Sequence, residues 1–236
     1  MRSQELDLSR YDTEKIPLGY LAYYEPFLAQ WVDKTMTLLE LGVFKGESIA
    51  LWRDYFPQGT IVGIDKNLSR LTSNHDLNER IRLFQGKQAD TGFLTHVARQ
   101  TAPGGFDIIV DDASHDAEPT KISFWHLFDN HLKPGGLYVI EDWTTGYWDD
   151  WPDGKTVRPP SLAERISAAV ATAFAHRKKR RQRSHDFGMV GFVKQLIDEQ
   201  GAADLTRGNY TGKPKRESKF HSMTITPSIV FIRKHG

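Results

Sequence analysis

The sequence predicts an α/β protein with a Rossmann-like, doubly wound sheet of about seven strands, mostly parallel, with an antiparallel strand from a terminal hairpin. Three observations carry this prediction. Short apolar runs alternate with segments of helical periodicity, as in successive βαβ units. Residues 38–65 read as strand, glycine turn, helix and strand. Two further apolar runs, within residues 220–232, flank Pro227 and Ser228 and predict the hairpin.

Composition limits the classes of protein that remain. The chain has 236 residues, with 31 Lys and Arg against 30 Asp and Glu, so its formal charge of +1 provides no global field for nucleic acid or membranes. It contains no cysteine, which excludes disulfides, thiolate nucleophiles and zinc–thiolate sites. No run approaches 18 apolar residues, and the first ten residues lack the apolar core of a signal peptide. We therefore expect a soluble, cytoplasmic protein.

We expect one domain in four segments. A polar lead-in and a helix with one apolar face occupy residues 1–35, and the cofactor-binding core occupies residues 36–142. An insertion with further helices extends over residues 143–215, and residues 216–236 form the hairpin.

The glycine turn is the first candidate site. Glu40 ends the first strand, Gly42 and Gly46 follow with Ser48, and Asp65 ends the second strand. Glycine allows the backbone to approach a ligand closely, and an acid about 20 residues further on can accept both hydroxyls of a ribose. The spacing differs from that of dinucleotide folds and suits a ligand without a pyrophosphate. The alternative is a tight strand-to-helix turn that binds nothing.

A second candidate site follows two later strands. The predicted fourth strand, residues 106–112, ends in Asp111 and Asp112, and the fifth, residues 137–140, is followed by Glu141 and Asp142. Because adjacent parallel strands end at the same edge, these carboxylates should converge, and up to three can share one centre.

Carboxylates that close repel one another unless a cation joins them or one of them is protonated, and Mg²⁺ is the ion that best suits such oxygen ligands. His115 lies three residues beyond Asp112 and could take a proton from a hydroxyl at that centre. The alternative for each residue is structural, as a helix cap, a turn cap or a partner of the backbone.

The glycine turn resembles motif I and the ribose-binding acid of class I S-adenosylmethionine-dependent methyltransferases. The resemblance implies that Gly42 approaches the methionine part of the cofactor and Asp65 its ribose, while Glu40 fixes the loop or the amino group. In the loop after the third strand, Gln88 and Asp90 become candidates for the adenine, although Asp90 could equally cap the next helix.

A narrower resemblance covers residues 11–148. The segments Asp-Asp-Ala-Ser-His at 111–115 and Pro-Gly-Gly-Leu-Tyr-Val-Ile-Glu-Asp at 134–142 resemble Mg²⁺-dependent sugar O-methyltransferases of macrolide biosynthesis, of the mycinamicin VI 2''-O-methyltransferase type. The glycine turn also resembles the related cephalosporin hydroxylase family. This resemblance implies that Asp112, Glu141 and Asp142 bind the metal, that His115 is the general base, and that Asp111 lies on the cofactor side. Ala113 departs from the glycine frequent at that position.

The N-terminal segment 11–15 is similar to a Thr-Asp-Lys triplet in bacterial sugar O-methyltransferases, with Glu14 in place of the aspartate. Whether Lys15 reaches the site stays open at this point. Three tryptophans within residues 143–160 suit either a sugar ring or a subunit contact.

The expected function is methyl transfer from S-adenosylmethionine to a hydroxyl, on a glycosyl unit of a natural product or glycolipid, with Mg²⁺ as second cofactor. The expected partner is a hydroxylated small molecule; a homo-oligomer is compatible with the sequence, and a membrane is not expected. The alternatives are an RNA methyltransferase that uses the basic run 177–183, where six of seven residues are Lys or Arg, and a cofactor-binding module without turnover. A charge run is usually a solvated face, so nucleic acid is not the expected partner.

Overall fold

A computed structural model describes residues 1–72, 79–148, 150–155, 184–204 and 216–236. The basic run 177–183 lies outside the described residues, as does much of the predicted insertion at 143–215. Within the described part, no helix is long and apolar enough to cross a bilayer.

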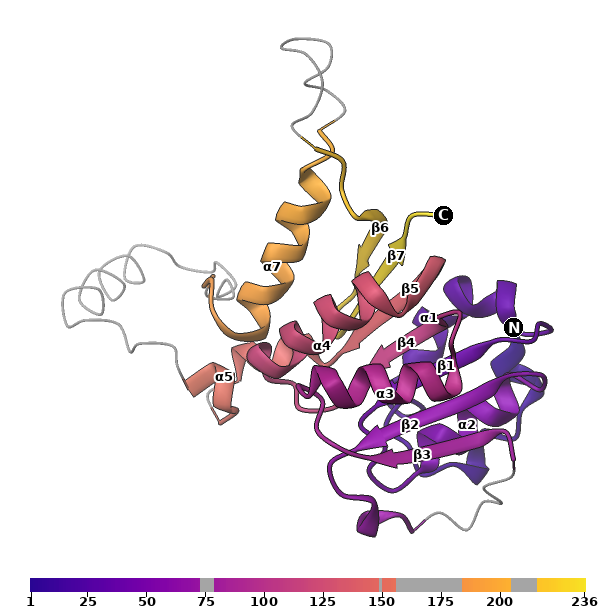
Figure 1. Ribbon diagram of the computed structural model, residues 1–236. Helices are drawn as coiled ribbons and strands as arrows, with labels where there is room; N and C mark the ends of the chain where they lie inside the picture. Colours follow the sequence, from indigo (N-terminus) through magenta and orange to yellow (C-terminus); the bar gives the residue numbers. More distant parts are fainter. Residues whose placement is uncertain (73–78, 149, 156–183, 205–215) are drawn as a thin grey trace.

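One seven-stranded sheet organises the molecule, with the strand order β3-β2-β1-β4-β5-β7-β6 (Figure 1). The first five strands run parallel, and β7 inserts antiparallel between β5 and β6. This arrangement confirms the predicted fold class. The strands are β1 (Thr37–Leu41), β2 (Thr60–Asp65), β3 (Ile81–Gln85), β4 (Phe106–Asp111), β5 (Leu132–Glu141), β6 (Phe220–Ile225) and β7 (Ile229–Lys234).

Helices cover both faces of the sheet. The longer helices are α1 (Tyr20–Leu28), α2 (Glu47–Tyr55), α3 (Thr91–Thr101), α4 (Ala117–Asn130) and α7 (Gly188–Gly201), and α5 (Pro152–Lys155) is a single turn. Short 3-10 turns occupy Arg2–Glu5, Leu8–Arg10, Ala29–Trp31, Leu68–Arg70 and Trp143–Tyr147.

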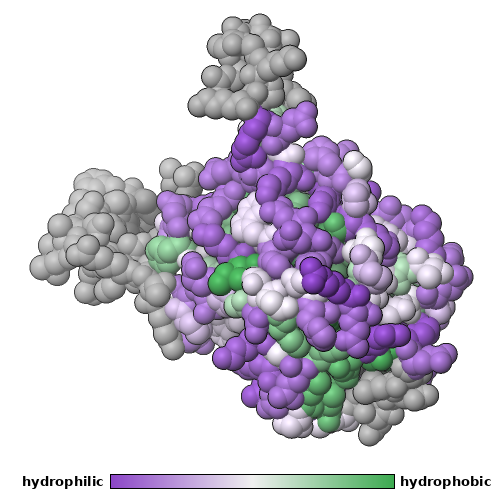
Figure 2. Space-filling view, viewed as in Figure 1, coloured by the Kyte–Doolittle hydropathy of each residue, from purple (hydrophilic) through white to green (hydrophobic). Residues whose placement is uncertain are grey.

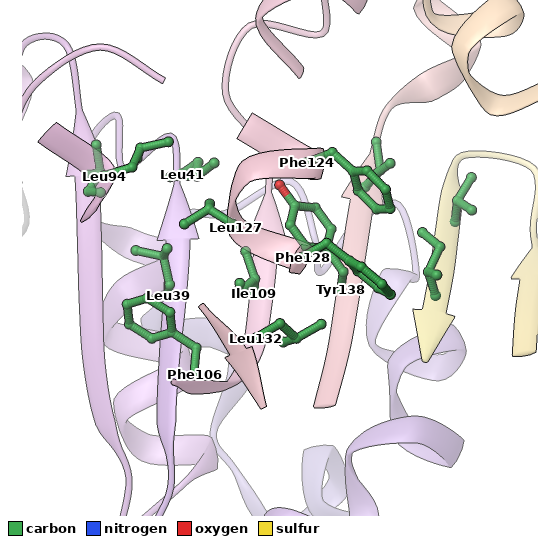
Figure 3. Close-up of a cluster of buried hydrophobic side chains, with 14 of the residues drawn as sticks. Leu39, Leu41, Leu94, Phe106, Ile109, Phe124, Leu127, Phe128, Leu132 and Tyr138 are labelled. Carbon is green, nitrogen blue, oxygen red and sulfur yellow. The ribbon is translucent and has the colours of Figure 1, made fainter. Parts of the chain in front are cut away.

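Alternation along the strands builds two separate cores. Leu39 and Ile109 point to the side of α3, α4 and α7, where aromatic side chains of α4 pack on the sheet (Figure 3). Leu38 and Ile108, one residue earlier, point to the other side and pack with α1 and α2. The central strands are therefore buried on both faces, as their near-continuous apolar sequence predicted. The outer face shown in Figure 2 is largely hydrophilic.

Two local predictions are only partly correct. The spacing of apolar residues predicts a helix face made of Ile122, Trp125, Phe128 and Leu132. Phe128 and Leu132 are buried, but Ile122 is 42% exposed, Leu132 belongs to β5, and the buried face of α4 includes Phe124 and Leu127. Periodicity failed here because Trp125 packs only partly on the core while Phe124 lies against the sheet. The dipeptide Gly135-Gly136 after Pro134 predicts a turn before the fifth strand, but this segment lies within β5, where the register with β4 shifts.

Candidate active site

The carboxyl ends of β1, β2, β4 and β5 meet at one edge of the sheet. In the ladder, Leu41 pairs with Asp111, and Asp111 pairs with Ile140. Asp112, which follows β4, and Glu141, which ends β5, therefore lie side by side at the carboxyl edge of the sheet. The strand order reverses between β1 and β4, and such a switch point is where open α/β sheets bind ligands.

The glycine loop after β1 lies directly against the β4 loop. Gly42 has φ +92°, and a Cβ on it would lie 2.0 Å from the carbonyl oxygen of Asp112. Gly46 also has positive φ, at +89°, and precedes α2. Only glycine is tolerated at position 42, because both the left-handed backbone and the close approach of the Asp112 carbonyl exclude a side chain. The loop predicted to bind the cofactor therefore packs directly against the loop that carries Asp112 and His115.

Asp65 holds the glycine loop in place. Its Oδ2 accepts hydrogen bonds from the backbone N–H groups of Val43 and Phe44, both at 2.9 Å, and its Oδ1 accepts one from Asn67 at 2.8 Å. The structure therefore assigns Asp65 a loop-closing role that the sequence did not predict.

Glu40 and Ser48 lie beneath the same loop. The Glu40 carboxylate is fully buried and accepts hydrogen bonds from Ser48 Oγ at 2.8 Å and from Trp52 Nε1 at 3.2 Å. These contacts agree with the expectation that Glu40 fixes the loop, since they join the end of β1 to α2.

Among the described residues, Asp112, His115 and Asp142 form a group that could hold a metal ion. One ligand atom from each of the three lies within 4.8 Å of the others. The Nε2 atom of His115 is 3.7 Å from Asp112 Oδ1 and 3.9 Å from Asp142 Oδ2. The three side chains are 16–27% exposed, so an ion and its waters can reach them. Two carboxylates with this access fit a hard divalent cation such as Mg²⁺.

The backbone at this group is strained. His115 and Asp142 have φ values of +50° and +54°, in the left-handed region that is uncommon for residues other than glycine. The carbonyl of His115 accepts hydrogen bonds from Trp151 Nε1 at 3.0 Å and from Thr145 Oγ1 at 3.4 Å. Strain of this kind tends to concentrate at functional sites and persists because surrounding contacts fix it.

The Glu141 carboxylate, predicted as a metal ligand, is directed toward Lys15. Lys15 Nζ donates to both Glu141 oxygens, at 2.9 and 2.8 Å, and to Asp112 Oδ2 at 2.7 Å. Burial raises the pKa of Glu141, and the neighbouring ammonium only partly offsets this effect. Asp112 belongs both to this inner group and to the outer group with His115 and Asp142.

Two tyrosines of α1 complete the acidic centre. Tyr20 OH donates to Asp142 Oδ1, and Tyr24 OH donates to Glu141 Oε1. Burial and these carboxylates raise the pKa of both phenols, so the hydroxyls stay protonated and remain donors. The sequence had not predicted a role for either tyrosine. The available signal was their spacing of four residues, which places both hydroxyls on one helix face.

Gln88 and Asp111 are joined in a partly buried hydrogen-bond network. Gln88 Nε2 donates to Asp111 Oδ1 at 2.7 Å, and Ser114 Oγ donates to Gln88 Oε1 at 2.8 Å. Asp111 is 2% exposed, and burial raises its pKa to about 6. This network supports the loop that contains Ser114. Asp90 caps α3 by accepting from the Phe93 N–H at 2.9 Å, so the capping alternative describes its contact.

The three tryptophans after β5 lie in different surroundings. Trp151 bonds to the His115 carbonyl, Trp143 donates to the Thr226 carbonyl at 3.1 Å, and Trp148 is 51% exposed. Of the three, Trp148 therefore has the most surface free for an acceptor or another subunit.

A comparison with protein families indicates the class of protein. Residues 39–143 match the family model of a methyltransferase domain. This match and the mostly parallel seven-stranded sheet define an α/β methyltransferase fold.

Particular relatives narrow the comparison. The chain is 38% identical to mycinamicin VI 2''-O-methyltransferase of Micromonospora griseorubida, over 59% of this chain and 36% of the relative. It is 34% identical to 8-demethyl-8-alpha-L-rhamnosyl tetracenomycin-C 2'-O-methyltransferase of Streptomyces olivaceus, over 92% of this chain and 50% of the relative. The chain spans about a third to a half of the length of the curated O-methyltransferases that it matches.

The fold of this chain is also similar to that of a solved methyltransferase structure. MycE methyltransferase from the mycinamycin biosynthetic pathway, in complex with Mg, SAH and mycinamycin VI, gives a TM-score of 0.69 at 28% identity. The alignment covers 96% of this chain and 52% of MycE.

Proposed function

We propose that this protein is an S-adenosylmethionine-dependent and Mg²⁺-dependent O-methyltransferase that acts on a hydroxyl of a glycosylated small molecule. The observation that carries the proposal is the meeting of two loops. The glycine loop, closed by Asp65, lies against the Asp112 carbonyl, and the Asp112 side chain belongs to the cluster with His115 and Asp142.

In this proposal Asp112 and Asp142 hold the metal, with Glu141 as the third carboxylate. Glu141 Oε2 accepts from Lys15, and a carboxylate oxygen retains a further lone pair after one such bond. Bound there, Mg²⁺ would lower the pKa of an acceptor hydroxyl. The Tyr20 and Tyr24 hydroxyls orient Asp142 and Glu141, so the carboxylates are held in position before any ligand arrives.

His115 takes the proton of the acceptor hydroxyl. Its Nε2 lies beyond hydrogen-bond distance of the nearest oxygens of Asp112 and Asp142, so these carboxylates leave it free to accept a proton. Methyl transfer from a sulfonium requires a deprotonated oxygen aligned with the methyl carbon, and little covalent assistance. Gly42, Gly46, Glu40, Ser48 and Asp65 shape the cofactor side, with Gln88, Asp90 and Asp111 at the adenine end.

The acceptor class rests on the relatives, whose names describe O-methyl transfer to mycinamicin VI and to a rhamnosyl tetracenomycin. Trp148 offers an exposed aromatic face that suits a sugar ring. The RNA alternative depended on the basic run 177–183, which lies outside the described residues, and no contact of a described residue supports it.

The test is a mass-spectrometric screen of glycosylated natural products with the purified protein, S-adenosylmethionine, and either Mg²⁺ or a chelator. We expect a methylated product that requires the metal. His115→Ala should lower turnover by about 10²-fold or more, with unchanged Mg²⁺ affinity by calorimetry; His96→Ala, an exposed histidine on α3, is the matched control. Loss of Mg²⁺ binding in His115→Ala would make His115 a ligand instead. Cofactor binding without metal-dependent transfer to any acceptor would favour a binding module.

A further inference from the structure

Lys15 is a buried cation within a cluster of acids. Its side chain is 2% exposed, and its Nζ lies 2.7 Å from Asp112 Oδ2, 2.8 Å from Glu141 Oε2 and 3.4 Å from Glu40 Oε1. Glu40 and Glu141 are themselves 0% and 2% exposed. A lysine is almost never buried this completely unless it is paired, and here three carboxylates share the one ammonium.

The chain places Lys15 there through several contacts. Tyr11 OH donates to Asp54 Oδ2 at 2.7 Å, and the Asp12 N–H donates to Glu47 Oε2 at 3.2 Å, which fixes the segment before Lys15 against α2. After it, the Lys15 carbonyl accepts from the Tyr20 N–H at 2.9 Å at the start of α1. Lys15 is therefore held on both sides, although it is about 100 positions from Asp112 in the sequence.

The formal charges around Lys15 are unequal. When all are ionised, Glu40, Asp112, Glu141 and Asp142 contribute four negative charges, and Lys15 reduces the sum to three. Lys15 contacts the inner three carboxylates, while the outer group of Asp112, His115 and Asp142 is the one open to solvent. Asp112 is shared, so the charge of Lys15 acts on the outer group across a single carboxylate.

We propose that Lys15 is a positioning residue that serves as a built-in cation for the inner carboxylates and thereby sets the affinity of the outer group for a divalent ion. The inference rests on the metal centre of the proposed function. The inference predicts the direction in which loss of the Lys15 charge changes the affinity for a divalent ion. Removal of a positive charge this close raises the negative potential at the outer group and should tighten divalent binding on the order of tenfold or more. A lysine that only filled space or stabilised the fold would not change the affinity in this direction.

The experiment measures Mg²⁺ and Mn²⁺ binding by calorimetry in the absence of cofactor and acceptor. Lys15→Met removes the charge at similar length, and Lys15→Arg retains it. We expect Lys15→Met to bind the ion about tenfold more tightly than the wild type and Lys15→Arg to stay within about threefold. The ion should also raise the melting temperature more in Lys15→Met than in the wild type. Equal or weaker binding by Lys15→Met would overturn the inference.

A second pair of variants keeps the test informative if Lys15→Met alone fails to fold. Glu40→Gln removes one inner negative charge and should weaken divalent binding, whereas Lys15→Met/Glu40→Gln restores the formal charge and should bind within about threefold of the wild type. Unequal affinities of the double variant and the wild type, or no difference between Glu40→Gln and the double variant, would also overturn it. Asp112→Asn separates the two proposals: if it binds the ion as the wild type does, the metal centre itself is wrong, and the inference falls with it.

Discussion

Replacing Gly42 by alanine should disable the site through a collision between two loops. The added Cβ would lie 2.0 Å from the Asp112 carbonyl oxygen and 2.6 Å from its carbonyl carbon. Ordinary contact begins at 3.4 Å, so the β4 loop must move by roughly 1.4 Å, and these are backbone atoms that no rotamer change can displace. The left-handed backbone, at φ +92°, adds about 1–2 kcal/mol of strain for a residue with a Cβ.

The expected cost in stability is about 2–5 kcal/mol, from overpacking of about 1–3 kcal/mol together with the backbone strain. A displacement of this size next to Asp112 should lower turnover by about 10²-fold. Urea unfolding measures the first quantity, and steady-state kinetics with calorimetry of Mg²⁺ and S-adenosylmethionine measure the second.

The matched control is Gly92→Ala on α3, where the nearest atom to the added Cβ is Asp90 Oδ1 at 3.5 Å and φ is ordinary. It should change stability by about 1 kcal/mol or less and leave turnover unaltered. A folded Gly42→Ala with wild-type turnover would refute the reasoning, because the loops would then not constrain each other.

Two other substitutions test separate parts of the structure. Asp65→Ala removes the acceptor of the Val43 and Phe44 N–H groups and should weaken S-adenosylmethionine binding at least tenfold, with a loss of about 1–3 kcal/mol in stability; calorimetry showing wild-type affinity would remove Asp65 from the cofactor site. Burial alone would raise the pKa of Asp54, but hydrogen bonds from the Arg53 guanidinium and from the Tyr11 hydroxyl hold that pKa below its usual value. Its stabilising effect is therefore present above the unfolded-state pKa near 4 and is lost as pH falls through the folded-state value. The difference in unfolding free energy between wild type and Asp54→Asn should be largest near pH 7 and should shrink as pH falls below about 4, and a difference independent of pH would contradict this.

Local patterns were sufficient wherever the physical signal was itself local. The parallel strands, the glycine turn and the hairpin follow from apolar runs, breakers and spacing, and the sheet confirms them. The acids at the ends of β4 and β5 were predicted to meet because the edge of a parallel sheet brings strand ends together whatever the details of packing.

Side-chain direction was not predictable in the same way. Glu141 and Asp142 are neighbours in sequence, yet one faces the ammonium of Lys15 and the other faces His115. The face of α4 was likewise misjudged, since helical spacing gives a period and only the contact with the sheet selects the phase.

The sequence by itself determined which segments form strands and helices, which loop requires glycine, and which acids lie at one edge of the sheet. These features follow from backbone sterics and hydrophobic alternation, which act over a few residues. Only the tertiary structure decided which carboxylates contact the Lys15 ammonium and which are open to solvent. Lys15, Tyr20 and Tyr24 come from a segment about 100 positions away, and their long-range contacts with Asp112, Glu141 and Asp142 depend on how α1 packs across the sheet.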